Sequence, residues 1–106
     1  NDARQVHISD PVYAYVVDLV TATRENEFIE LGVSPRGALA LCRMAKSCAF
    51  VRGRDYVIPE DVAAVFDDVC CHRLVLSAKA RLHRLSAADV TAEIVKTVKM
   101  PQVQEK

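Results

Sequence analysis

The fold of this chain is decided at residues 32–41, GVSPRGALAL, where the sequence marks the start of a helix. Ser34 suits the N-cap position, and Pro35 suits the first helical position because its missing N–H would be unpaired there anyway. Arg36 then falls in the first turn, where the helix dipole disfavours a positive charge by roughly 0.3–1 kcal/mol. This arginine therefore predicts a nearby anion, which is either a bound phosphate or a carboxylate from a neighbouring helix.

The helix that begins here is predicted to end near residues 52–53. Its apolar stripe consists of Ala38, Leu41, Cys42, Ala45, Cys48 and Ala49. Arg36, Arg43 and Lys46 share the opposite face. For Arg43 and Lys46 a solvated polar face is the simpler interpretation, whereas Arg36 needs a compensating partner.

Three further helices follow from apolar periodicity and from proline or serine at their starts. They are expected over residues 10–25, from Pro59 to near His72, and over residues 86–98, where Ser86 and Asp89 have the spacing of a capping box. Short extended segments are expected in DYVI (55–58) and LVLS (74–77), and these two could pair. The predicted fold is all-α, with four helices and at most a very short two-stranded pairing.

Composition limits the function. The 106 residues fit one domain, and the formal net charge of zero argues against a dedicated nucleic-acid module. No apolar run approaches the roughly 20 residues that cross a bilayer. Neither a phosphate-binding glycine loop nor a catalytic His or Ser pattern is present, so the chain alone is not expected to be an enzyme.

The four cysteines, Cys42, Cys48, Cys70 and Cys71, lack the CxxC spacing of zinc sites. We expect free thiols and no bound metal.

The segment GRDYVIPEDVAAV (53–65) has two interpretations, because similar loops enter the final helix of histone-fold proteins. A histone fold, however, needs a longer central helix and usually a basic surface, so a small histone-like DNA- or protein-binding module is kept as the alternative.

Three motifs together carry a resemblance to a known family. YVVDLVTATRE (15–25), LGVSPRGALALCRMAKSCAFVRGRDYVIPEDV (31–62) and VCCHRLVLS (69–77) resemble, in order and spacing, the C-terminal lid of MoxR-family AAA+ ATPases and of magnesium chelatase. The agreement is weaker through the last helix to Pro101. The family usually reads Gly-Ala-Ser-Pro-Arg-Ala at the second-helix start, so Val33 and Gly37 stand here where alanines are common.

The resemblance implies that Arg36 is the sensor-two arginine, the lid residue that reaches the phosphates of ATP. It implies that the Walker loop, the metal-holding acid and the arginine finger belong to an α/β core outside this chain. ATP and magnesium are then cofactors of a longer parent protein, and none is expected for the fragment. Thr23-Arg24 also matches the family's first-helix ending, but their chemistry alone assigns them no role.

The same resemblance sets the expected organisation. Residues 1–9 are expected to be a linker from the missing core, residues 10–101 the helical lid, and residues 102–106 a polar tail. Expected partners are the AAA+ core, neighbouring subunits of a ring (a hexamer in the parent) and proteins with von Willebrand factor A domains, with no nucleic acid and no membrane span. The parent would be a cytoplasmic, chaperone-like ATPase that remodels clients or serves their metal insertion and maturation.

Overall fold

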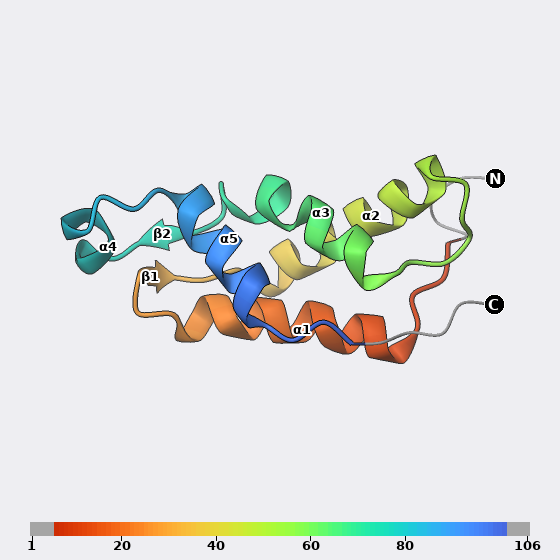
Figure 1. The fold of residues 1–106 in the computed structure, drawn as a ribbon, viewed down its shortest axis with the longest axis horizontal. Coiled ribbons are helices and arrows are strands. Elements are labelled where there is room, and N and C mark those ends of the chain that lie inside the picture. The colour runs from red at the N-terminus through yellow and green to blue at the C-terminus, as the bar shows by residue number, and fades with distance from the viewer. Residues whose placement is uncertain (1–5, 102–106) are drawn as a thin grey trace.

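The computed structural model describes residues 6–101, so residues 1–5 of the predicted linker and the whole predicted tail, 102–106, lie outside it. The all-α fold class is confirmed. The elements in chain order are α1 (Asp10–Glu25), β1 (Ile29–Leu31), α2 (Pro35–Val51), α3 (Pro59–Cys70), β2 (Val75–Leu76), α4 (Ala78–Leu82) and α5 (Ala87–Thr97). They form an elongated body of 46 × 24 × 20 Å, with β1, β2 and α4 gathered at one end of the long axis (Figure 1).

Serine caps start α2 and α5 as predicted. The Ser34 hydroxyl accepts a hydrogen bond from the Gly37 N–H at 3.1 Å. At α5 the Ser86 hydroxyl accepts from the Asp89 N–H at 3.1 Å, while the Asp89 carboxylate accepts from the Ser86 N–H at 2.9 Å. The predicted capping box is therefore confirmed. Hydrogen bonds from Ser86, first of all from its backbone N–H, lower the pKa of the Asp89 carboxyl.

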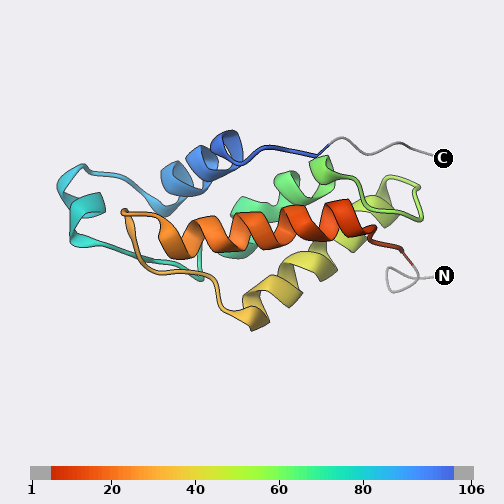
Figure 2. The ribbon, with the colours of Figure 1, turned by 90° about the horizontal axis from the view of Figure 1, so that it is seen from below.

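The core lies between α1, α2 and α3, with α5 laid across it. Seen from below, α2 lies on one side of α1 and α5 on the other (Figure 2). Small residues on α2 let α3 approach closely, because the buried part of the predicted stripe is largely alanine. The main buried side chains are Val12, Tyr15, Val16, Leu19, Leu41, Ala45, Ala49, Val62, Phe66, Val69, Cys70 and Ile94.

The predicted strand pairing is wrong in one partner. LVLS contains β2, but β2 pairs antiparallel with β1, in the register Ile29 to Leu76, and not with DYVI. The reason is geometric: DYVI and LVLS flank opposite ends of α3, whose 12 residues separate them by about 18 Å. Residues 55–58 instead contact the chain's beginning, where the Val57 N–H donates to the His7 carbonyl at 2.8 Å.

A fifth helix, α4, was not predicted. It has five residues, which are too few to show an apolar period, although Ser77 caps it by accepting from the Ala80 N–H at 3.3 Å. Among residues 6–101, no helix combines the length and apolar character that a membrane crossing requires.

Candidate functional site

Arg36 is the second residue of α2, and its side chain is exposed. The first turns of α1, α3 and α5 carry acidic residues, whereas that of α2 carries none. Within the described part of the chain, no hydrogen bond or ion pair joins the Arg36 side chain to another residue. The carboxylate that the sequence allowed as a structural partner is therefore not found among residues 6–101.

The other two basic residues of this face differ in exposure. Arg43 is exposed and Lys46 is half-buried. Both lie further along α2, beyond the first turn in which the dipole field is strongest. A solvated polar face describes Arg43 well, so Arg36 remains the residue of this face whose position calls for an anion.

Two side chains from the last turn of α1 hold Val33, which lies two residues before the start of α2. Thr23 is fully buried; its hydroxyl donates to the Val20 carbonyl at 2.6 Å and accepts from the Val33 N–H at 3.0 Å. The Arg24 Nε donates to the Val33 carbonyl at 3.1 Å. Both backbone polar groups of Val33 are thus bonded by side chains of α1. We call this set, Thr23, Arg24 and Val33, the clamp.

Gly32 makes the clamp sterically possible. A Cβ atom at this position would lie 2.8 Å from the Thr23 Oγ1 and 2.9 Å from the Arg24 backbone nitrogen. Real Cβ atoms do not approach that closely, so only glycine lets the loop lie against the end of α1. The chemistry of Thr23-Arg24 in the sequence gave no hint of this role, and the match to the family's first-helix ending was the only signal.

The end of α3 also reaches the start of α2. The Arg73 Nε donates to the Val69 carbonyl at 3.1 Å, which holds the Arg73 stem against Gly37. A Cβ atom on Gly37 would lie 3.2 Å from the Arg73 Cδ and 2.7 Å from the Val33 Cγ1. Val33 therefore occupies the space that an alanine at position 37 would need. Valine at position 33 is thus sterically compatible with glycine, and not with alanine, at position 37.

This shared space predicts strong coupling between the two positions. Gly37→Ala alone should destabilise the chain by about 1–2 kcal/mol, because overpacking outweighs the gain in helix propensity. Val33→Ala alone should cost about 2 kcal/mol through a cavity. In the double variant the added methyl fills that cavity. The double variant should therefore lose about 2 kcal/mol less free energy of unfolding than the sum of the two single losses. Urea unfolding of the four proteins measures this, and additive losses would contradict it.

An apolar groove of about 450 Å³ runs between α1 and α2. The exposed side chains of Tyr13, Val17 and Leu39 line it, and Arg24 and Pro35 line it as well. The groove therefore extends to the start of α2. It places apolar surface next to the helix start that carries Arg36.

All four cysteines are free thiols; Cys70 is buried, and Cys42, Cys48 and Cys71 are half-buried. None is bonded to another cysteine, and no group of three or more potential metal ligands occurs among residues 6–101. Burial raises the pKa of the Cys70 thiol to about 12, and burial is also the main cause that raises the pKa of Cys42, Cys48 and Cys71. At neutral pH these thiols are protonated, which makes them poor nucleophiles.

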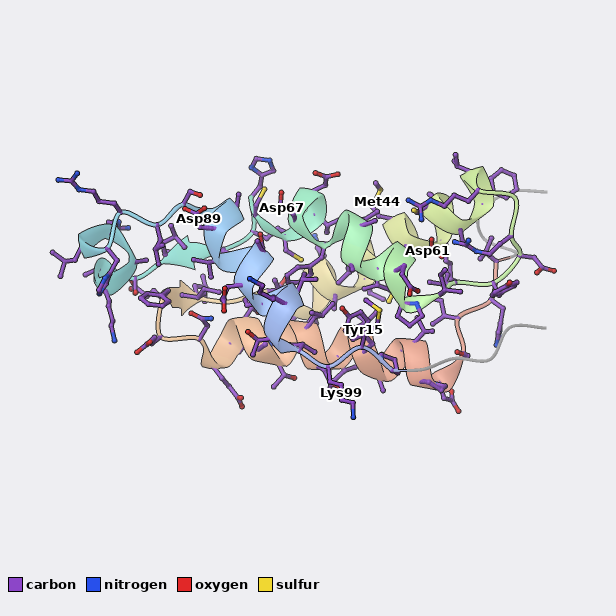
Figure 3. All side chains as sticks on the ribbon, viewed as in Figure 1. Tyr15, Met44, Asp61, Asp67, Asp89 and Lys99 are labelled. Atoms are coloured by element: carbon purple, nitrogen blue, oxygen red, sulfur yellow. The ribbon has the colours of Figure 1, made fainter. Side chains whose placement is uncertain are left out.

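A second polar cluster lies near the loop between α2 and α3 (Figure 3). Asp61 is fully buried; its carboxylate accepts from the Ile58 N–H at 3.0 Å, pairs with Arg54, and lies 3.5 Å from the Arg52 Nη1. The hydrogen bond to Asp61 is the main cause that raises the pKa of Arg54. These contacts of Asp61 within the segment GRDYVIPEDVAAV (53–65) hold the end of α2 against the start of α3.

Comparison with known proteins identifies the family. The model of the AAA lid domain matches residues 21–96. Chaperone MoxR1 of Mycobacterium tuberculosis is 44% identical over an alignment 98 positions long that covers 84% of this chain and 26% of that protein. The uncharacterized protein YeaC of Bacillus subtilis is 35% identical over 94% of this chain and 31% of its own length.

A solved structure agrees with this match. The crystal structure of a proposed ATPase from Cytophaga hutchinsonii superimposes with a TM-score of 0.85 at 33% identity, over 94% of this chain and 33% of that chain. The chain thus spans about a third or less of the length of the proteins it matches. It belongs to the AAA lid domain family, and it is a lid of the kind found in MoxR-family AAA+ ATPases.

Proposed function

We propose that this chain is the lid of an ATP-hydrolysing ring protein and that Arg36 contacts the phosphates of ATP bound by the α/β core. One observation carries the proposal: an exposed arginine lies in the first turn of α2 with no partner among the described residues. A phosphate placed there would interact with both the guanidinium fork and the positive end of the helix. Magnesium would be held by the core together with the phosphates.

The wider activity of the parent is proposed by analogy with a relative. The name Chaperone MoxR1 supports a chaperone-like role. In that role ATP hydrolysis would drive remodelling or maturation of client proteins, including metal insertion. We propose that the parent works as a ring, a hexamer, in the cytoplasm, together with partners that carry von Willebrand factor A domains. Arg36 would then report to the lid whether the phosphates of ATP are present.

Substitution of Arg36 in the full-length protein tests the proposal. Arg36→Ala should lower ATP turnover by about tenfold or more, because a charge-assisted contact to a transferring phosphate is worth several kcal/mol in a water-poor site. The stability of the lid should be unchanged or raised by a few tenths of a kcal/mol, since an unfavourable charge leaves the helix start. Arg36→Lys should restore turnover only in part, because an ammonium lacks the planar fork.

Arg43→Ala is the matched control, since Arg43 is exposed on the same face of α2 about two turns later. It should change turnover much less than Arg36→Ala. Steady-state ATPase assays and thermal unfolding measure both quantities. If Arg36→Ala unfolds the lid and leaves turnover intact, the arginine is a structural ion-pair partner, and the proposal is wrong.

A further inference from the structure

The segment between the clamp and Arg36 has little freedom to rotate. Only Ser34 and Pro35 separate Val33 from Arg36. The proline ring fixes its own φ, and Ser34 is held at φ −77° and ψ 167° by its bond to the Gly37 N–H. Whatever fixes the peptide groups of Val33 therefore also fixes the direction of the first turn of α2.

The bonds that fix Val33 come from α1 and not from α2 itself. The Thr23 hydroxyl bonds its N–H, and the Arg24 Nε bonds its carbonyl. We infer that Thr23 and Arg24 are positioning residues for Arg36: they transmit the orientation of α1 to the first turn of α2 and so aim the Arg36 guanidinium. This inference rests on the proposed contact between Arg36 and phosphate.

The rate of ATP turnover should depend strongly on the position of the Arg36 guanidinium. Loss of the Thr23 hydroxyl would leave the buried Val33 N–H without its partner, and the loop would shift to regain one. A phosphate contact requires placement within about 0.5 Å, and a displacement of about 1 Å can cost roughly 100-fold in rate. A small shift of the loop would thus displace the Arg36 guanidinium without unfolding the lid.

Thr23→Val in the full-length protein tests this, because valine keeps the shape and removes the hydroxyl. We expect ATP turnover to fall by about tenfold, Thr23→Ser to keep most of the turnover, and Arg24→Lys, which loses the Nε donor, to lower turnover by about threefold.

The matched control is Thr91→Val. Thr91 is equally buried; its hydroxyl donates to Asp67 Oδ1 at 2.6 Å and lies 3.1 Å from the Ala88 carbonyl oxygen, but it lies on α5. It should change turnover by less than about twofold at a temperature at which all variants are folded. Equal losses in Thr23→Val and Thr91→Val would mean that the effect is general destabilisation, and would overturn the inference.

A double-mutant cycle separates positioning from any independent role. If Thr23 acts through Arg36, then Thr23→Val should lower the turnover of the Arg36→Ala protein by less than about twofold. A further tenfold loss in that background would overturn the inference and leave the proposed role of Arg36 intact. If Arg36→Ala has full turnover, the proposed function fails and the positioning role fails with it.

Discussion

Asp61→Ala is expected to lower the free energy of unfolding of the chain by about 3–5 kcal/mol. Removing one partner of a buried ion pair costs this much because the remaining charge is left without compensation. Here the charge left behind is that of Arg54, whose side chain is only 21% exposed. The Ile58 N–H loses its acceptor as well, so α3 loses the bond that fixes its start.

Urea or thermal unfolding of the chain measures this loss. Asp61→Asn should be milder, since the amide oxygen can still accept from the Ile58 N–H. The matched control is Glu27→Ala, which breaks the ion pair with Lys79 at 2.6 Å. Because these side chains are 62% and 50% exposed, the cost should be below about 1 kcal/mol. Equal losses at the two positions would show that the burial of Asp61 contributes nothing.

Gly32→Ala is expected to destabilise the chain by roughly 3 kcal/mol, the upper part of the range for overpacking. The added methyl would meet the Thr23 Oγ1 at 2.8 Å and backbone atoms of residues 23 and 24 at 2.9 Å. A backbone cannot rotate aside as a long side chain can. The loop must therefore move away from α1, which also breaks the bond between Thr23 and the Val33 N–H.

Gly53→Ala is the control for this variant. Gly53 has a φ of +82°, and a Cβ atom there would have nothing within 4 Å. Its substitution costs only the backbone strain of a left-handed conformation, about 1–2 kcal/mol. Chemical denaturation compares the two variants. If Gly32→Ala costs no more than Gly53→Ala, the close approach of loop and helix is not required for stability.

The helix starts were predictable because each carries its own local signal. Pro11, Pro35 and Pro59 lie at the beginnings of α1, α2 and α3, and Ser86 caps α5. Such signals act within a single turn, so sequence spacing is enough to read them. The unusual place of Arg36 could be found for the same reason, since the dipole effect is confined to the first turn.

The features that the sequence did not predict depend on how the helices are placed in space. The pairing of β1 with β2 requires that α1 and α3 end at the same side of the molecule, which no local pattern states. The bonds from Thr23 and Arg24 to Val33 cross nine or ten residues of chain. Their chemistry is ordinary for a helix end, so only the packed structure gives them a role.

The space shared by Val33 and Gly37 also constrains how the two positions can change during evolution. Valine at 33 with alanine at 37 places two carbon atoms 2.7 Å apart, whereas alanine at 33 with glycine at 37 leaves a cavity in place of the lost methyl groups. A lineage that starts from alanine at both positions therefore passes through a less stable intermediate in either order, which is overpacked if position 33 changes first and underpacked if position 37 changes first. The two substitutions are therefore expected to be kept as a pair, and reversal at one position alone should be disfavoured.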